Sequence, residues 1–383
     1  MYIELTDEQR ALQAELREYF SSLISADEAE IMMTERHGPT YREVIRRMGK
    51  DGWLGVGWPK QYGGRGFGDV EQQIFANEAV RADVPLPAVT LQTVGPTLQT
   101  YGSEEQKQKF LPAILAGEVH FAIGYSEPEA GTDLAALRCS AVRDANGDFV
   151  VNGQKIFTTG GHDADYIWLA VRTGPPDSRH RGISILIVDT KDPGYSWTPI
   201  ITCDGAHHVN ATYYSDVHVS AEMLVGQENA GWKLITTQLN HERVMLGPAG
   251  RIGGLYDKLR SWASARNLLD RSDVQRILGE IHATYRLNEL LNWQVASVEG
   301  AVDIADASAT KVFATERIQR VGRLAEELVG RHGDPSDPET AQLQDWLDKQ
   351  VKRNLVITFG GGVNEVMREL IATAGLKLPR VPR

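Results

Sequence analysis

The first third of the chain repeats apolar residues at helical spacing. Thr6 is followed three residues later by Gln9, a capping-box pattern that predicts the start of a helix. A second helix is predicted after Pro39, because proline favours the first position of a helix. The apolar stripes consist of Leu12, Leu16 and Phe20 in the first helix and Tyr41, Val44, Ile45 and Met48 in the second. Residues 71–82 and 104–116 predict two more helices, after a glycine-rich loop at 55–68.

The middle of the chain changes from helical spacing to strand-like alternation. Asn146-Gly147 is a hairpin-turn dipeptide and stands just before Phe149 and Val151. Short β-branched or aromatic runs follow at 166–171, 183–188 and 211–219, each bounded by turn residues. These runs predict an antiparallel β-barrel domain over about 121–225.

The last third is helical again, with long apolar patterns at 231–260, 273–297, 304–330 and 338–375. Four long helices of this kind predict an antiparallel four-helix bundle. The predicted fold class is therefore α+β, with three domains. They are an N-terminal helical domain (1–120), a central β domain (121–228) and a C-terminal bundle (229–383).

Composition narrows the function classes. A net charge of -11 argues against a nucleic-acid surface, and two cysteines are too few for a disulfide framework. No apolar run is long enough to span a membrane, and the N-terminus carries no signal-peptide pattern. We therefore expect a soluble, cytoplasmic protein without nucleic-acid or membrane partners, and no motif in the chain suggests a metal site.

Four segments carry a family resemblance. They read DGWLG with WPKQYGG (51–64), YSEPEAGTD (125–133), NGQKIFTT (152–159) and GGGVNEVMR (360–368). In this order and at this spacing the chain resembles the acyl-CoA dehydrogenases, and the likeness spans almost its whole length. The resemblance implies the acyl-CoA dehydrogenase fold, an FAD cofactor, an acyl-CoA substrate and an electron-transfer flavoprotein as electron acceptor.

The resemblance also implies which residues bind the flavin. Those at the matching positions are Ile123, Tyr125, Ser126, Gly131, Thr132, Phe157, Thr158 and Thr159. In the family, the residue at Ser126 bonds near the reactive nitrogen, and Thr132 also lies near the pantetheine arm of the substrate. Phe157 replaces the usual tryptophan, which keeps an apolar face but loses the indole donor. Taken without the resemblance, the segment at Ser126 is an ordinary turn and Phe157 is a core residue.

The catalytic base is assigned by comparing two family positions. Most members carry a glutamate where this chain has Gly361, and others carry it on the first helix of the bundle, where this chain has Glu242. The resemblance therefore makes Glu242 the base, with the β-hydrogen leaving as hydride to the flavin. It makes Asn240, Arg243 and the N–H of Gly361 substrate-binding groups. The alternative is that Glu242 is a solvent-exposed glutamate on a helix, paired with Arg243.

Two segments that complete a neighbour's FAD site in family tetramers are altered. The Arg-x-x-Phe-Gly segment is missing at 261–269, and in the Gln-x-x-Gly-Gly-x-Gly segment Glu327 replaces the glutamine and Arg331 a glycine. A carboxylate would repel a pyrophosphate, although Arg331 could bind a phosphate directly. We therefore predict a homologous partner subunit in an α2β2 assembly with two FADs, the alternative being a homotetramer.

The substrate class follows from a narrower resemblance. The run at 84–87, Pro96 and the closing segment 378–383 resemble actinobacterial dehydrogenases that shorten steroid side chains in cholesterol catabolism. Three glycines at 360–362 would leave room for a bulky steroid acyl-CoA. A non-catalytic partner subunit and an acyl-CoA oxidase remain as alternatives.

Overall fold

The computed structural model describes residues 4–245, 247–298 and 303–379, and for 239–245 it describes the backbone only. The N-terminal part is helical, as predicted. Its helices are α1 (Asp7–Leu23), α2 (Ala26–Thr34), α3 (Pro39–Lys50), η1 (Lys60–Tyr62), α4 (Asp69–Arg81), η2 (Val89–Val94), α5 (Gly95–Tyr101) and α6 (Glu104–Leu115). The capping box is confirmed, since Thr6 Oγ1 accepts from Gln9 N at 3.2 Å and Gln9 Oε1 accepts from Thr6 N at 3.0 Å. Both predicted apolar stripes are buried.

The central part is an eight-stranded sheet in the order β6-β7-β3-β2-β4-β5-β8, with β1 also paired to β4. The strands are β1 (Phe121–Gly124), β2 (Ser140–Arg143), β3 (Phe149–Thr159), β4 (Tyr166–Arg172), β5 (Ile183–Asp189), β6 (Tyr195–Ile201), β7 (His207–Val219) and β8 (Leu224–Val225). Short 3-10 turns lie between them, namely η3 (Leu134–Ala136), η4 (Pro176–Gly182) and η5 (Ala221–Met223).

The sheet is mixed, so the prediction of purely antiparallel pairing was wrong on this point. Strands β1 and β2 each run parallel to β4. Alternation of apolar residues fixes which side chains are buried, but it carries no information on the direction of a partner strand. The predicted turn at Asn146-Gly147 is confirmed: it joins β2 to β3, and Gly147 has φ 90°.

The C-terminal part contains α7 (Gly231–Met245), α8 (Gly250–Ala265), α9 (Ser272–Ala296), α10 (Ile304–His332), α11 (Pro338–Arg353), η6 (Val356–Thr358), α12 (Asn364–Leu370) and η7 (Ile371–Gly375). Two of the four predicted long helices are therefore interrupted. In the stretch 338–375, α11 ends at Arg353 and α12 begins at Asn364, and the glycine loop 360–362 lies between them, with Gly361 and Gly362 at φ 64° and 100°. These are left-handed conformations that glycine adopts without strain and that a helix cannot contain.

The stretch 231–260 breaks before Pro248, which lacks the N–H and would clash with the preceding turn. Buried asparagines bind the backbone groups that the break exposes. Asn288 and Asn292 donate to Gly247 O, each at 3.1 Å, and Asn77 of α4 accepts from Gly250 N at 3.1 Å. The break is thus a built feature of the fold and not a frayed end.

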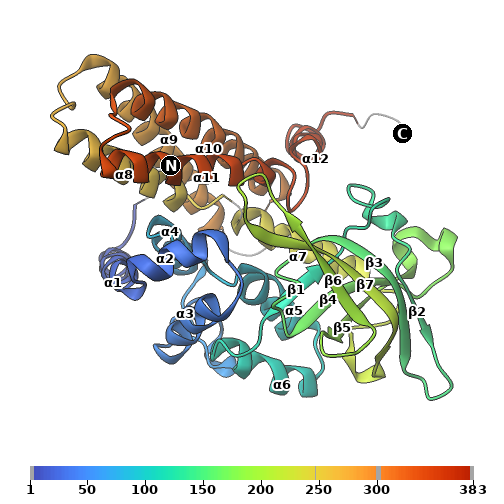
Figure 1. The fold of residues 1–383 in the computed structure, drawn as a ribbon. Coiled ribbons are helices and arrows are strands. Elements are labelled where there is room, and N and C mark those ends of the chain that lie inside the picture. Colours follow the sequence, from blue (N-terminus) through green and yellow to red (C-terminus); the bar gives the residue numbers. More distant parts are fainter. Residues whose placement is uncertain (1–3, 246, 299–302, 380–383) are drawn as a thin grey trace.

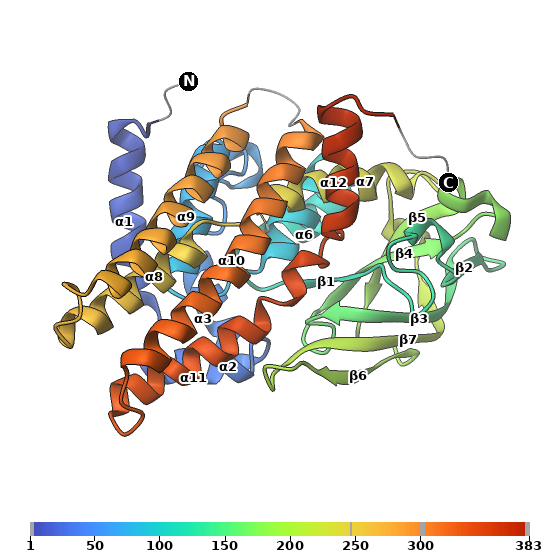
Figure 2. The ribbon, with the colours of Figure 1, turned by 90° about the horizontal axis from the view of Figure 1, so that it is seen from above.

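The three parts meet at α7 (Figure 1). This helix packs against η2 of the N-terminal part, β5 of the sheet and α10 of the bundle. Seen from above, α10 and α12 lie side by side (Figure 2). In the described part of the chain, no helix combines the length and the apolar character that crossing a lipid bilayer requires.

Candidate functional site

The end of β1 is tied to α7 by a buried chain of hydrogen bonds. Trp168 Nε1 of β4 donates to Tyr125 Oη at 3.2 Å, and Tyr125 Oη donates to Gln238 Oε1 on α7. Trp168 and Gln238 are almost completely buried. The segment predicted to line the flavin therefore lies directly against α7, one helical turn before the position of Glu242.

A buried ion pair between β3 and the loop after β1 stabilises the same segment. Lys155 Nζ binds Glu127 Oε1 at 2.8 Å and Tyr125 O at 3.1 Å, and the Lys155 side chain is 0% exposed. Glu127 also accepts from Arg138 N at 2.7 Å and Cys139 N at 2.8 Å. A buried charge with this many partners fixes the backbone around it. The turn after Tyr125 is thus a rigid wall rather than an ordinary surface loop.

Strand β3 presents Phe157 to the outside. The pairing of β3 with β7 shifts register between Lys155 and Thr158, and within this bulge Phe157 has φ 61°. A left-handed aromatic residue is a strained conformation that needs surrounding structure to hold it. The Phe157 side chain is 61% exposed, so it is not a core residue. Thr159 next to it is exposed as well.

Thr158 points the other way. Its Oγ1 lies 3.2 Å from Thr212 Oγ1 of β7, and the residue is 1% exposed. Only its main chain could therefore meet a ligand on the outer face. The prediction of a turn at Asn152-Gly153 was wrong. These two residues lie within β3 at another register shift, with Gly153 at φ 147°. An added Cβ at Gly153 would lie 2.7 Å from Cys139 Cα, so only glycine fits.

The remaining predicted flavin residues lie around the same turn. Ile123, on β1, is partly buried and pairs with Trp168 of β4. Ser126 O accepts from Ile156 N at 2.8 Å, which joins the turn to β3. Gly131 and Thr132 are exposed on the loop that follows. The structure thus gathers all the predicted flavin residues on the β1 end, its loop and β3.

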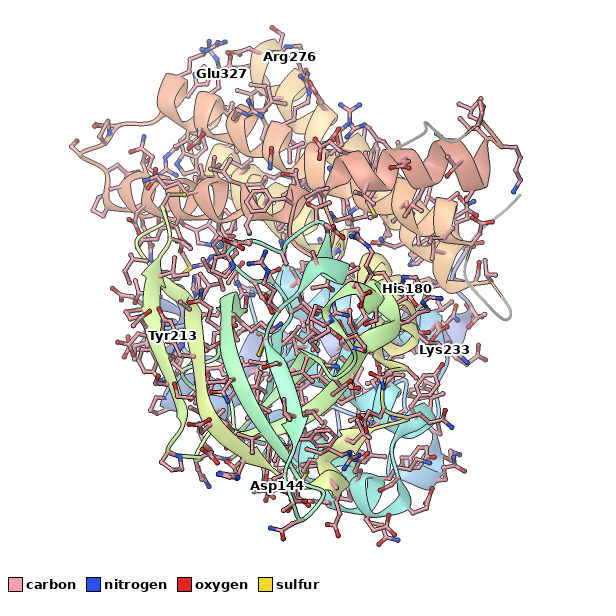
Figure 3. All side chains as sticks on the ribbon, turned by 90° about the vertical axis from the view of Figure 1, so that its right-hand side faces the viewer. Asp144, His180, Tyr213, Lys233, Arg276 and Glu327 are labelled. Carbon is pink, nitrogen blue, oxygen red and sulfur yellow. The ribbon has the colours of Figure 1, made fainter. Side chains whose placement is uncertain are left out.

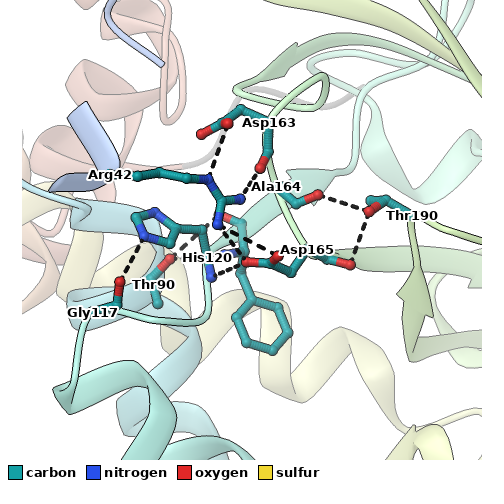
Figure 4. Close-up of polar contacts among 9 residues, drawn as sticks. Arg42, Thr90, Gly117, His120, Asp163, Ala164, Asp165 and Thr190 are labelled. Atoms are coloured by element: carbon teal, nitrogen blue, oxygen red, sulfur yellow. Dashed lines mark hydrogen bonds and ion pairs between the residues drawn. The ribbon is translucent and has the colours of Figure 1, made fainter. Parts of the chain in front are cut away.

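An ion-pair clamp holds the loop that follows Thr159 against the N-terminal helices (Figure 4). Arg42 of α3 binds Asp163 at 3.0 Å and Asp165 at 3.1 Å. Asp165 also accepts from His120 N at 2.8 Å, and Thr190 Oγ1 donates to Asp165 O at 3.0 Å. Burial raises the pKa of Asp163, although the Arg42 guanidinium opposes this effect. The clamp fixes where β3 ends relative to α3.

The predicted base and two predicted substrate-binding residues lie on α7. The backbone of Asn240, Glu242 and Arg243 is helical, but their side chains lie outside the described residues. Gly361 is partly buried in the loop between η6 and α12. Helix α10 packs against both α7 and α12, so the two segments that carry these residues rest on one helix.

Sequence reasoning missed several residues that shape the site. They are Arg42, Lys155, Gln238 and Lys311. Lys311 is the clearest case, because its Nζ donates to Gly362 O and to Asn364 Oδ1, the latter at 3.2 Å. The available signal was a polar residue on an otherwise buried stripe of a helix or strand, which is rare unless the group has a partner.

The residues present fit a planar, partly apolar cofactor. Phe157 offers an outward apolar ring on a rigid bulge, with the Thr159 side chain exposed beside it. The turn at Ser126 adds a hydroxyl next to a braced backbone. Aromatic packing with a few placed polar groups is the usual composition of a cofactor site.

Comparison with known proteins gives the family. Three family models match, described as the acyl-CoA dehydrogenase N-terminal domain (residues 6–118), middle domain (122–217) and C-terminal domain (229–376). The acyl-CoA dehydrogenase FadE29 of Mycobacterium tuberculosis (strain ATCC 25618 / H37Rv) is 71% identical over 388 residues, covering 100% of both chains.

Two solved structures are similar over the full length of both chains. The Mycobacterium tuberculosis ChsE4-ChsE5 complex matches with 46% identity and a TM-score of 0.90. The Tcur3481-Tcur3483 steroid ACAD matches with 45% identity and a TM-score of 0.93. The predicted fold class and enzyme class are therefore confirmed, and this chain belongs to the acyl-CoA dehydrogenase family.

Proposed function

We propose that the protein catalyses the FAD-dependent α,β-dehydrogenation of a steroid side-chain acyl-CoA, with Glu242 as the base. The steroid substrate is supported by the likeness to the Tcur3481-Tcur3483 steroid ACAD. FAD is supported by the family, whose members are generally flavoproteins, and by the fit of the Phe157 face. The observation that carries the proposal is the Tyr125–Gln238 contact. It sets α7 against the loop 125–132 and the Phe157 face of β3, which together form the proposed flavin wall.

The geometry of α7 explains why Glu242 is the proposed base. Gln238 and Glu242 are four residues apart on one helix, so they lie on the same face. Gln238 on that face meets Tyr125. Glu242 then occupies the next turn of the face that looks toward the flavin wall.

Each proposed residue has one task in the reaction. The Glu242 carboxylate removes the α-proton, while the Gly361 N–H donates to the thioester oxygen, where negative charge develops. Asn240 and Arg243, on the same helix, contribute to binding of the CoA thioester. FAD supplies the acceptor for the β-hydride when bound. Phe157 and Thr159 would hold it, and the braced turn at Ser126 would fix its orientation.

The test is Glu242→Gln, assayed with a panel of CoA thioesters that includes a saturated steroid side-chain acyl-CoA and octanoyl-CoA. Loss of a general base predicts a fall in kcat/KM of roughly 10²–10⁴-fold, with FAD content unchanged. Glu365→Gln is the matched control, because Glu365 is an exposed carboxylate three residues from the glycine loop. Equal activity of Glu242→Gln and the wild type would remove Glu242 from the mechanism.

We also propose a homologous partner subunit, in an α2β2 assembly with two FADs. The alternative that Arg331 binds a phosphate is weakened by its contacts, since Arg331 binds Glu327 at 2.6 Å and lies 3.8 Å from Asp273. Glu327 lies on the bundle at the end remote from Asp144 of the sheet (Figure 3). At this surface Arg331 is paired with two carboxylates and is not a free cation.

The assembly is tested by purifying the chain alone and together with the product of a neighbouring homologous gene. The proposal predicts one FAD per two chains in the mixed complex and poor FAD retention by the chain alone. A stable homotetramer with one FAD per chain would overturn it.

We propose an electron-transfer flavoprotein as the electron acceptor. An oxidase would instead release hydrogen peroxide in stoichiometric amounts during turnover in air. Peroxide measurement with and without an electron-transfer flavoprotein separates the two activities.

We further propose that the chain is cytoplasmic and divides into domains at 1–120, 121–228 and 229–383. The divisions are supported by the family models, whose matches end at 118 and 217 and begin again at 122 and 229.

A further inference from the structure

The glycine loop 360–362 has no side chains with which to fix its own shape. Gly361 and Gly362 both adopt left-handed conformations, and glycine has the greatest backbone freedom of any residue. A backbone N–H can stabilise a developing oxyanion only if it is held in place beforehand, because reorientation during the reaction removes the advantage. Some other part of the molecule must therefore fix this loop.

The anchor is a lysine on the adjacent helix. Lys311 of α10 is 0% exposed, and its Nζ donates to Gly362 O and to Asn364 Oδ1, the first residue of α12. The ammonium thus binds the last glycine of the loop and the start of the following helix at once. Helices α10 and α12 lie side by side here (Figure 2).

The residue one helical turn further along α10 extends the anchor. Thr315 Oγ1 accepts from Asn364 Nδ2 at 3.0 Å and donates to Lys311 O at 2.8 Å. Asn364 Nδ2 also donates to Glu316 Oε1 at 3.2 Å, and Arg368 binds the same oxygen at 2.6 Å. Helix α10 therefore holds the first turn of α12 through three side chains, those of Lys311, Thr315 and Glu316.

We propose that Lys311 is a positioning residue for the reaction, which fixes the glycine loop so that the Gly361 N–H meets the thioester oxygen. This inference rests on the proposed function, because it takes Gly361 as the oxyanion donor. A buried ammonium is well suited to the task. It is a compact donor of three hydrogen bonds, and hydrogen bonds from charged groups are about twice as strong as neutral ones.

The test compares two ligands that differ only at the carbonyl. One is the 2-enoyl-CoA product of the best substrate from the panel above, and the other is the CoA alkenyl thioether with the same carbon skeleton, which has no carbonyl oxygen. Their dissociation constants are measured by flavin absorbance in the assembly that the wild-type chain forms. The wild type is expected to prefer the thioester, because only the thioester can accept the Gly361 hydrogen bond.

Lys311→Met is expected to reduce this thioester preference by about 10-fold, the equivalent of one lost hydrogen bond. It should also lower kcat more than it raises KM. Thr315→Val removes the acceptor for Asn364 Nδ2 and the donor to Lys311 O but leaves the Lys311 ammonium in place. It should therefore reduce the preference in the same direction by a smaller factor. This milder variant keeps the test informative if Lys311→Met does not fold.

Ser308→Ala is the matched control. Ser308 is buried on α10 one turn before Lys311, and its hydroxyl donates to Ile304 O of the same helix at 2.6 Å. The thioester preference of the Ser308→Ala variant should equal that of the wild type.

Two negative results have different meanings. An unchanged preference in Lys311→Met and Thr315→Val, with wild-type activity intact, overturns the Lys311 inference and leaves the proposed function standing. A wild type that dehydrogenates no CoA thioester and shows no preference overturns the proposed function itself.

Discussion

The substitution Lys155→Met should destabilise the protein strongly and loosen the flavin wall. Methionine has about the length of lysine but removes the charge that faces Glu127, whose side chain is only 7% exposed. Breaking a buried pair by removing one partner costs about 3–5 kcal/mol, because the other charge stays buried. Glu127 keeps its bonds from Arg138 N and Cys139 N, so the cost should lie near 3 kcal/mol.

A further loss comes from Tyr125 O, which accepts from Lys155 at 3.1 Å. A hydrogen bond from a charged group contributes about 2 kcal/mol, so the free energy of unfolding should fall by about 5 kcal/mol in all. At about 2 °C per kcal/mol for a large chain, the apparent melting temperature should drop by roughly 10 °C. FAD retention should fall too, since Tyr125 and its neighbours form the proposed flavin wall.

The assay is urea unfolding followed by tryptophan fluorescence at fixed protein concentration. Lys349→Met is the matched control, because its pair with Asp345 at 2.7 Å lies on the surface of α11 and should be worth about 0.5 kcal/mol. The double variant Glu127→Gln/Lys155→Met removes both charges and should recover much of the stability. A Lys155→Met protein as stable as Lys349→Met, or a double variant weaker than the single one, would refute the reasoning.

Three further predictions concern the sheet and the Arg42 clamp. Arg42→Met should lower the melting temperature and weaken FAD retention in a dialysis assay, because Asp163 then stays buried without its partner. Gly153→Ala should lower the expressed yield of folded protein, since its φ of 147° and a Cβ contact of 2.7 Å exclude a side chain. Burial lowers the pKa of His162 and of His208 to about 4. Their neutral forms therefore stabilise the fold fully above pH 6.5 and lose this effect as the pH falls toward 4, so thermal melts should show falling stability in that window, and less so in His208→Gln.

The local elements were largely readable from the sequence. The capping box at Thr6, the apolar stripe ending at Phe20 and the turn at Asn146-Gly147 all appear as predicted. Each depends on residues within about four positions of one another, so the physics that produces it is contained in the local sequence. The family motifs lie on contiguous segments that the fold brings together, and their role in flavin binding stays a prediction.

Where local sequence signals conflict, the tertiary structure decided which secondary structure formed. The apolar pattern of 231–260 reads as one helix, but the break at Pro248 is stable because Asn77, Asn288 and Asn292 bind its backbone. The turn-like Asn152-Gly153 became part of a strand, since β7 pairs along it and Gly153 lies against Cys139. Sequence alone could not supply these partners, which lie tens to hundreds of positions away.

The sequence by itself determined the element types, the family and the residue types available for catalysis. Only the tertiary structure showed that Gln238 meets Tyr125, that Arg42 clamps the end of β3 and that Lys311 holds the glycine loop. The reason is physical: burial of a polar side chain is tolerated only where distant partners satisfy it, and those partners exist only once the chain has folded.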